Sequence, residues 1–488
     1  MTARPAKRPT RDAYEFGGYG TLAEPELLFH PDRANERSAH PLEGLLNFGP
    51  YSRAILNQVV DPIRVAVIGP ERVMTTVSGV IAELNRQHEP RERKQYLRKF
   101  TGFKPIFGVR LVLADARALI ELPRTLDEEL SAARAPHAVL ADHIARALHR
   151  LQLVRDDFDV VIVYLPDRWE PGFYGPENDD FDLHAFVKAT AATLGIPTQL
   201  LREGSALTYP CRCSVAWRLS IALYVKAGGT PWRLVDMEPD TASIGLGYGL
   251  RDSHDGRPRF VNCCSQAFDA DGTGLDFIVY KANDFRTERD NPFLSRAEMH
   301  RLMARSLDLY QRRRGGRVPK RVIVHKTTEF QNEEIAGCLE ALGACAEIEL
   351  YQVQQNTAWR GVKIIAPRNQ HQKGEPANYP VPRGTYLPID EHEVLLWTQG
   401  DAPEAVGGRS YFKEGKGIPA PLLLRRFAGH GGWYDVCRHA LSLTKMNWNS
   451  DALYDRVPAT LSHATMLAEV ARRLDAAPSG PLQTRFFI

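Results

Sequence analysis

Long hydrophobic runs are absent from this chain, and no apolar segment follows its basic first residues, MTARPAKRPTRDAYEF. We therefore expect neither a membrane-spanning helix nor a secretory signal peptide. Cysteine is scarce as well: the seven cysteines form no paired CxxC framework, so no structural zinc site of that type is expected. An odd cysteine number without a secretory signal favours reduced thiols, and we predict a cytoplasmic protein.

An excess of one charge is also missing, because 62 Lys and Arg residues nearly balance 59 Asp and Glu residues, for a net charge of +3. The protein is not a polycation, although a near-neutral total can still include a basic groove. No GxGxxG follows a strand and no GxxxxGK[ST] is present, which ranks a small-molecule enzyme with a doubly wound sheet last among the functions considered. The 488 residues show no internal repeat and suffice for two or three domains.

Strands alternate with helices in the first half of the sequence. β-branched runs at 63–70, 107–115 and 158–166 predict strands, and helical spacing covers 125–153. Such alternation predicts an α/β fold in which a parallel sheet has helices on both faces.

Changes in this pattern predict the domain boundaries. The beginning of the chain has few helical signals and much Pro and Gly, which predicts an N-terminal tail and extended lead-in over 1–60. A helix that ends at Gly228 precedes a new pattern, in which 241–281 is typical of a meander of strands. We therefore predict one domain over 61–230 and a second over 231–488.

Four polar side chains of the first domain form a candidate phosphate-binding set. His184 and Lys188 share one helix face, Gln199 follows the turn at GIPT, and Lys226 lies in the last turn of the next helix. A terminal phosphate needs several convergent donors, which lysine, imidazole and amide groups supply. Taken singly, each residue also fits a role without a ligand: Lys226 complements the helix dipole, and the others fit a solvated surface.

The order HAFVK, GIPTQ and YVKAGG resembles the MID domain of Argonaute proteins, and SIGLGYG, VIVHKTTEF and VPATLSHATMLAEVA resemble the PIWI domain that follows it. The resemblance implies a Rossmann-like MID domain followed by an RNase H-like PIWI domain. It also implies that His184, Lys188, Gln199 and Lys226 bind the 5′ phosphate of a guide strand. In bacterial members the last carboxylate often joins a divalent cation there, so the resemblance implies a Mg²⁺ site that includes the carboxylate of Ile488.

Three metal-ligand positions of a PIWI nuclease are substituted in this chain. The resemblance aligns these positions with Gly247, Thr327 and Thr465. A two-metal nuclease needs acidic ligands, and neither glycine nor a neutral hydroxyl replaces a carboxylate for Mg²⁺. We therefore expect no catalytic residues and no guided cleavage. The alternative is an active RNase H-like guided endonuclease that uses other carboxylates; the candidates are Asp236, Asp240, Glu329, Glu333 and Asp455.

At 488 residues only MID and PIWI domains fit, an architecture that resembles the short prokaryotic Argonautes. The resemblance implies a guide, RNA in preference to DNA, that pairs with single-stranded target DNA. It further implies a heterodimer with an APAZ-containing effector, which carries a sirtuin-like or TIR NAD-consuming domain or a nuclease. Such pairs act in antiviral defence and anti-plasmid immunity. The sequence leaves the effector, the guide chemistry and the oligomer after activation open.

Base pairing reads sequence in guided effectors, so the protein itself needs to hold backbone phosphates. We expect Arg425 and Arg426, which follow the apolar run PAPLLL, to contact the nucleic-acid backbone, together with Lys445 and Asn447 of TKMNWNS. Trp448 either stacks on a base or belongs to the core.

Three further segments have two interpretations each. The basic segments 91–100 and 311–317 either line a channel or form ordinary exposed surface. The apolar segment 27–29 either docks on a partner or packs on its own chain.

Overall fold

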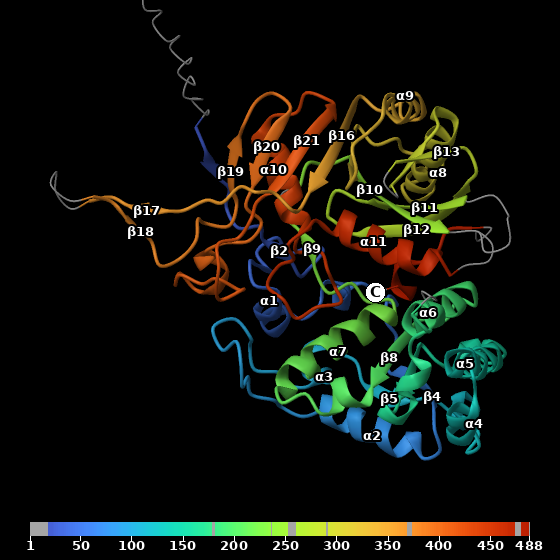
Figure 1. Cartoon of the computed structure of the whole chain (residues 1–488). Coiled ribbons are helices and arrows are strands. Elements are labelled where there is room, and N and C mark those ends of the chain that lie inside the picture. Colours follow the sequence, from blue (N-terminus) through green and yellow to red (C-terminus); the bar gives the residue numbers. More distant parts are fainter. Residues whose placement is uncertain are drawn as a thin grey trace, which may run out of the picture.

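A five-stranded parallel sheet lies at the centre of the first half of the chain (Figure 1). The computed structural model describes residues 18–177, 181–235, 237–251, 260–288, 291–367, 373–473 and 480–487. The strands are β4 (Ile63–Gly69), β5 (Leu111–Leu113), β6 (Leu119–Glu121), β7 (Val160–Leu165) and β8 (Thr198–Arg202). Their order is β5-β4-β7-β8, β6 also pairs with β4, and every pair is parallel, as the sequence predicts.

Helices cover both faces of this sheet because both faces of its strands are apolar. The helices are α2 (Val73–Leu84), α3 (Phe103–Phe107), α4 (Leu126–Ala132), α5 (Pro136–Gln152), α6 (Leu183–Thr193) and α7 (Arg212–Lys226). Val65 of β4 packs in a core with α2 and α7, whereas Ala66 packs in a second core with α4, α5 and α6. Successive strand side chains point to opposite faces, so a strand buried on both sides needs an uninterrupted apolar run.

Two predicted elements of this half differ from the structure. The strand expected over 107–115 begins only at Leu111, because α3 occupies the residues before it and ends at Gly108, whose φ is 77°. The helical pattern over 125–153 is two helices, since the chain is extended at Ala133, is still non-helical at Ala135 and becomes helical again at Pro136. The ring of a proline disfavours the helical conformation of the residue before it.

A nine-stranded sheet forms the framework of the second half. In spatial order its strands are β1 (Gly20–Thr21), β19 (Thr385–Pro388), β20 (Glu393–Leu396), β21 (Leu422–Ala428), β16 (Glu347–Gln354), β15 (Arg321–Lys326), β10 (Thr241–Arg251), β11 (Phe260–Phe268) and β12 (Gly274–Ala282). β10, β15 and β16 run parallel, and the other neighbours are antiparallel. The meander predicted over 241–281 is therefore confirmed as β10, β11 and β12.

Helices lie on both faces of this sheet too. They are α8 (Arg296–Arg313) and α9 (Asn332–Ala341) on one face, and α10 (Trp433–Leu443) and α11 (Ala459–Ala471) on the other. Val324 of β15 packs with α8 and α9, whereas its neighbour Ile323 packs with α10 and α11. The alternation of strand side chains again explains the two layers.

The lead-in segment packs on its own chain. β2 (Leu27–Leu28) pairs with β3 (Arg37–Ser38) and with β9 (Arg233–Leu234), and α1 (Pro41–Phe48) follows. Leu27 and Phe29 are fully buried in the core of the first half. A Cβ at Gly44 of α1 would lie 2.0 Å from the Phe29 ring, so glycine is required there. Of the two interpretations of 27–29, the structure supports packing on its own chain.

Smaller elements connect these layers. The strands among them are β13 (Phe285–Glu288), β14 (Asn291–Leu294), β17 (Ile364–Ile365) and β18 (Glu375–Pro376). The short helices are η1 (Tyr51–Ala54), η2 (Ala116–Ala118), η3 (Arg155–Asp157), η4 (Asp167–Gly172), η5 (Glu203–Leu207), η6 (Pro403–Val406) and η7 (Thr484–Phe486). All seven cysteines are buried thiols. No helix within the described ranges is long and apolar enough to cross a membrane.

Candidate nucleic-acid interface

Two of the predicted phosphate ligands lie on α6, which begins at a well-capped N-terminus. The Asp182 carboxylate accepts a hydrogen bond from the backbone N–H of Ala185, which starts the helix one residue before His184. Lys188 follows one turn later, and its side chain is buried. Its Nζ donates to the backbone oxygen of Thr198 at 3.1 Å, which ties α6 to the strand that carries Gln199.

Lys226 approaches from the last turn of α7 and is also buried, with 1% of its surface exposed. Burial lowers the pKa of Lys188 to about 7. Burial, followed by the charge of Lys188, lowers the pKa of Lys226 well below its usual 10.5. Although the His184 side chain is exposed at the surface, partial desolvation of its ring, followed by the charges of nearby groups including Lys188 and Lys226, lowers its pKa to about 4. The structure therefore brings these three groups within electrostatic reach of one another.

An anion suits this group of side chains. A negative charge placed beside two buried lysines, one of which also feels the charge of the other, would offset the cost of keeping both protonated. Neutral imidazole, the form that His184 takes near pH 7, still has one N–H donor. Gln199 follows on β8 directly after Thr198, the acceptor of the Lys188 hydrogen bond, but its amide donates to the backbone oxygen of Leu200 at 2.9 Å.

Two neighbouring groups were not singled out in the sequence. The hydroxyl of Thr198, whose backbone oxygen accepts from Lys188, is buried and has no hydrogen-bond partner within the described part of the chain. The guanidinium of Arg485 would lie 3.7 Å from a Cβ built on Gly228, just beyond α7. The helix that carries it, η7, packs against α6 and α7, and Figure 1 places the C-terminal end between the two halves. The sequence offered one signal for Arg485 as a site residue, namely that a basic residue stands close to the end of the chain.

The predicted Mg²⁺ site does not follow from the described side chains. Lysine, histidine and amide donors suit an anion, whereas Mg²⁺ requires oxygen ligands, preferably carboxylates. Asp182, the carboxylate whose charge is felt at His184, is used as the cap of α6. The predicted ligand Ile488 lies outside the described residues.

The two arginines expected at the nucleic-acid backbone have partners in the protein. Arg425 pairs with Glu393 across β20 and β21, at 2.6 Å, and 38% of its side chain is exposed. Arg426 lies over the ring of Trp433 at 4.1 Å and donates to the backbone oxygen of Gly431. Arg425 thus remains accessible to a ligand, whereas Arg426 is held by its neighbours.

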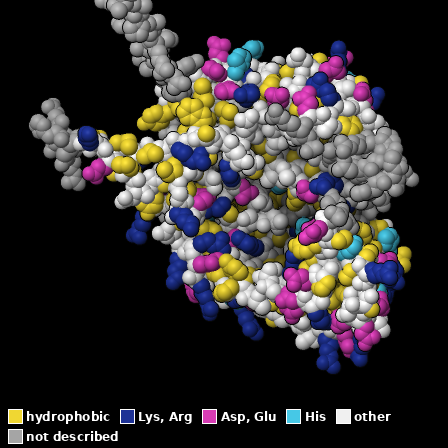
Figure 2. All heavy atoms as spheres, in the orientation of Figure 1, with side chains coloured by type: hydrophobic (Ala, Val, Ile, Leu, Met, Phe, Trp, Pro, Cys, Tyr) yellow, Lys and Arg dark blue, Asp and Glu magenta, His cyan; other side chains and the backbone are white. Residues whose placement is uncertain are grey.

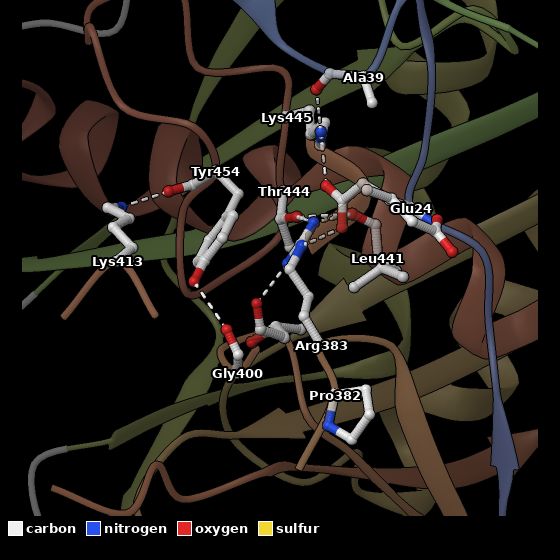
Figure 3. Close-up of polar contacts among 12 residues, drawn as sticks. Glu24, Ala39, Pro382, Arg383, Gly400, Lys413, Leu441, Thr444, Lys445 and Tyr454 are labelled. Atoms are coloured by element: carbon white, nitrogen blue, oxygen red, sulfur yellow. Dashed lines mark hydrogen bonds and ion pairs between the residues drawn. The ribbon is translucent and has the colours of Figure 1, made fainter. Parts of the chain in front are cut away.

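Lys445 is a buried ion-pair partner. Its Nζ lies 2.5 Å from a carboxylate oxygen of Glu24 and also donates to the backbone oxygen of Ala39. Arg383 donates to the other oxygen of Glu24 at 2.9 Å, and Figure 3 shows both cations directed at this one carboxylate. None of the Lys445 side chain is exposed. It is therefore not available to a backbone phosphate in this arrangement.

Asn447 and Trp448 follow Lys445 directly. Asn447 donates to the Asp455 carboxylate at 2.7 Å and accepts from the backbone N–H of Asn449. Trp448 is 7% exposed and packs in the core of the first half, which supports the core interpretation over base stacking.

The basic segments are mainly surface. Arg91, Lys94 and Lys99 of the loop after α2 are exposed. In 311–317, Arg312 and Arg313 at the end of α8 form ion pairs with Asp308 and Asp276. Figure 2 shows a hollow between the two halves in this view, with Lys and Arg side chains on its left side.

Gly247 allows the close packing of α11 on β10. A Cβ at this position would lie 2.4 Å from the backbone oxygen of Ala464, and one at Gly245 would lie 1.9 Å from the backbone oxygen of Thr460. Any side chain at Gly247, including aspartate, would require α11 to move. The substitution at this predicted ligand position therefore has a structural reason in the packing.

The other two substituted positions are exposed. Thr327 follows the end of β15, and its backbone oxygen accepts from the amide of Gln352 at 3.1 Å. Thr465 lies on α11, next to the Ala464 that faces Gly247.

The alternative carboxylates have separate local partners. Glu329 accepts from Gln331, Glu333 accepts from the backbone of Arg296, and Asp240 lies in the turn before β10 with a φ of 60°. Asp236 lies outside the described residues. Across the described ranges, no group of three or more His, Cys, Asp or Glu side chains is arranged to hold a metal ion.

Comparisons with known proteins give one curated relative and several solved structures. No family model matches the chain. The argonaute protein of Cereibacter sphaeroides is 25% identical over 319 residues, which cover 62% of this chain and 39% of that protein.

Solved structures of two bacterial Argonautes share the fold. Clostridium butyricum Argonaute, solved with a guide DNA and a 19-mer target DNA, aligns with a TM-score of 0.65 at 16% identity, over 96% of this chain and 55% of that one. A. aeolicus Argonaute aligns with a TM-score of 0.60 at 15% identity, again over 96% and 55%. The chain thus spans little more than half of these structures. The predicted resemblance to Argonaute proteins and the fold class, a Rossmann-like MID domain followed by an RNase H-like PIWI domain, are confirmed, whereas the short, inactive subtype stays a prediction.

Proposed function

We propose that this chain, which shares the MID and PIWI fold of Argonaute proteins, binds the 5′ phosphate of a guide strand and presents the guide for pairing with a target. The observation that carries the proposal is the approach of His184, Lys188 and Lys226 from two helices to one place. Burying cations is costly, so a chain in which two buried lysines lie within electrostatic reach of one another gains stability from an anionic ligand. The 5′ phosphate, with its three acceptor oxygens and a charge near −2, fits this requirement.

The proposed guide is RNA and the proposed target is single-stranded DNA. A relative of this fold was solved with guide and target DNA, which supports paired nucleic acid as the ligand class. The hollow between the halves and the partly exposed Arg425 support a path for the backbone. The choice between RNA and DNA guides depends on contacts to the 2′-OH. Comparing the affinities of matched RNA and DNA guides tests it.

We further propose that the chain does not cleave the target. The close contact of α11 at Gly247 leaves no space for an acidic side chain at that position, which supports this part of the proposal. Cleavage by a two-metal mechanism needs several carboxylates around one point.

The proposed partner is an APAZ-containing effector, with a sirtuin-like, TIR or nuclease domain, in a cytoplasmic defence against phage and plasmids. Support comes from the arm, defined as residues 359–367 and 373–379 with its strands β17 and β18, which projects away from the body (Figures 1 and 2). Its large apolar side chains are between 40% and 56% exposed; they are Trp359, Val362, Ile364, Ile365 and Tyr379. A two-stranded hairpin with exposed apolar side chains is marginal in water, and a protein surface would cover it.

One experiment tests guide binding and cleavage together. The purified chain is mixed with 5′-phosphorylated or 5′-hydroxyl guides and a matched labelled target, with Mn²⁺ present. We expect tighter binding of the phosphorylated guide and an intact target. Equal affinity for both guides would refute the phosphate site, and guide-dependent cleavage that disappears in Asp240→Ala would favour the nuclease alternative.

A further inference from the structure

A groove of about 1070 Å³ lies on the second half of the chain. It is lined by residues of α9, of the first part of β16, of the loop between β19 and β20, and of the segment 426–433. Its apolar side chains are accessible: Leu339 is 40% exposed, and Ile348, Phe427 and Trp433 are half-buried. Exposed apolar side chains gathered in one hollow mark an interaction surface, and this groove is large enough for a polypeptide segment.

Unmatched negative charge lies on the lining of this groove. Glu347 and Glu391 are exposed, and neither forms an ion pair with the described residues. The third carboxylate, Glu349, is buried and pairs with Arg321 at 3.0 Å. Two exposed carboxylates are therefore available to a cationic ligand.

The basic residues of the lining do not neutralise these carboxylates. Arg426 lies over the ring of Trp433 at 4.1 Å and donates to the backbone oxygen of Gly431. His392 and His430 also line the groove, and histidine carries little charge near pH 7. Carboxylates outnumber arginines on the lining by three to one, so the groove selects an occupant that is positively charged and partly apolar.

The first residues of the sequence have this complementary character. Residues 1–17, the basic tail, lie outside the described part of the structure. Arg4, Lys7, Arg8 and Arg11 all precede the first acidic residue of the chain. The aliphatic stems of lysine and arginine cover apolar surface while their charged ends reach carboxylates, so the basic tail suits both the floor and the charge of the groove.

The direction of β1 brings the basic tail toward the groove. β1 pairs antiparallel with β19, with Thr21 opposite Thr385 and Gly20 opposite Tyr386. Followed backward from Thr21, the chain therefore runs toward the end of β19 and the loop 389–392 that joins it to β20. Figure 1 shows β1, β19 and β20 side by side at this edge of the sheet.

The loop 389–392 borders the groove, and the basic tail is long enough to enter it. The indole of Trp433 donates to the backbone oxygen of Asp390 at 3.0 Å, which fixes the loop to the groove floor. Arg11 precedes Gly18 by seven residues, and an extended chain of that length spans up to about 24 Å. The cations of the basic tail therefore reach the groove without any change in the body of the protein.

We propose that the basic tail docks in this groove of its own chain, with its charged ends at Glu347 and Glu391 and their stems on the apolar floor. The contact lies within the chain and is separate from the phosphate set, so it goes beyond guide binding. A short tether gives an effective concentration on the order of millimolar, and a tail–groove affinity of about 0.1 mM then keeps about nine-tenths of the tail docked.

Zero-length cross-linking of the full chain tests the contact directly, because a carbodiimide joins an amine only to a carboxylate that touches it. We expect an amide between Lys7 and Glu391 or Glu347, identified by mass spectrometry of the digested chain. The exposed ion pair of Lys99 and Glu89, at 2.8 Å, is the positive control. Cross-linking of this control pair without any link from Lys7 to the groove would overturn the proposal.

Protection from trypsin gives a second measurement. Trypsin should cut after Arg11 about tenfold more slowly in the unmodified chain than in the double variant Glu347→Lys with Glu391→Lys, whose changes lie at exposed positions. Glu170→Lys with Glu177→Lys, at two exposed positions of the first half, makes the same change in charge and should keep the slow cleavage. Equal cleavage rates in all three folded chains, as judged by their thermal melts, would contradict docking.

Two other occupants give distinct outcomes. When isotope-labelled and unlabelled chains are mixed, a cross-link between a labelled and an unlabelled peptide would assign the groove to the tail of a second copy. Protection of the Arg11 site that requires added single-stranded RNA, and that persists in Glu347→Lys with Glu391→Lys, would assign the tail to nucleic acid. Either result overturns the proposal, whereas links within one chain in the absence of nucleic acid support it.

Discussion

Replacing Lys188 and Lys226 together by methionine should abolish the preference for a 5′-phosphorylated guide. Methionine retains most of the side-chain length, so the change removes two charges with little change in volume. The two lysines approach from α6 and α7, and both are buried, so solvent would screen their attraction to a phosphate only weakly. The 5′-hydroxyl guide lacks that phosphate and serves as the internal reference.

The magnitude follows from the kind of contact. A hydrogen bond to a charged group contributes about 1.5–3 kcal/mol, and two neighbours that share one ligand are not additive. We therefore expect a loss of at least about tenfold for the phosphorylated guide, or about 1.4 kcal/mol, and little change for the hydroxyl guide. Lys104→Met, on an exposed part of α3, is the matched charge control and should preserve the preference.

The preference for the 5′-phosphorylated over the 5′-hydroxyl guide should also depend on pH. Burial lowers the pKa of Lys188 to about 7 in the unliganded chain, and a bound phosphate raises it again. Binding therefore takes up a proton above about pH 7, and the affinity for the phosphorylated guide should fall by up to about tenfold per pH unit for each proton taken up. The pKa of His184, about 4, places its titration outside this range.

Fluorescence anisotropy with labelled guides at constant ionic strength measures both effects, because salt alone changes nucleic-acid affinity strongly. A ratio of the two guide affinities that is independent of pH and unchanged in the double variant would refute the reasoning.

The free energy of unfolding should change with pH in the direction opposite to the guide affinity. Between about pH 7 and 10.5 the unfolded chain binds a proton at Lys188 that the folded chain lacks, so the free energy of unfolding rises with pH there and Lys188→Met should flatten this rise.

Three further variants test the packing, the ion pair and the arm. Gly247→Asp should lower stability by about 1–3 kcal/mol in thermal melts and produce no cleavage, because its Cβ would collide with the backbone of Ala464. Lys445→Ala should destabilise the chain by about 1–3 kcal/mol through loss of the buried bond to Glu24, with the guide preference intact; loss of guide binding at full stability would instead restore its predicted backbone contact. Ile365→Asp on the arm should change stability by less than about 0.5 kcal/mol yet weaken capture of an effector in pull-downs, whereas undiminished capture would remove the arm from the interface.

The sequence predicted those residues of the candidate site whose positions are set within a single helix. The one-turn spacing of His184 and Lys188, and the position of Lys226 at a helix end, are visible in the sequence and persist in the structure. Thr198 and Arg485 show no spacing that would relate them to these residues. Their proximity depends on how β8, α7 and η7 pack together.

The role of the other basic residues could not be read from local pattern. Lys445 looks like a phosphate ligand in the sequence, but its charge is matched by Glu24 in the lead-in segment. The same carboxylate binds Arg383, which is 359 positions away. Arg426 is similarly held by the ring of Trp433. Whether a basic side chain is exposed or already paired depends on contacts between distant segments.

The sequence by itself determined the α/β class and the strand pattern of both halves, because apolar periodicity is a local property; the assignment of Gly247, Thr327 and Thr465 to metal-ligand positions came from the resemblance and stays a prediction. Only the tertiary structure decided which cations are buried, which are paired, and why glycine stands at 247, where α11 leaves no room for a Cβ. The physical reason is that burial and ion pairing are properties of segments brought together by packing.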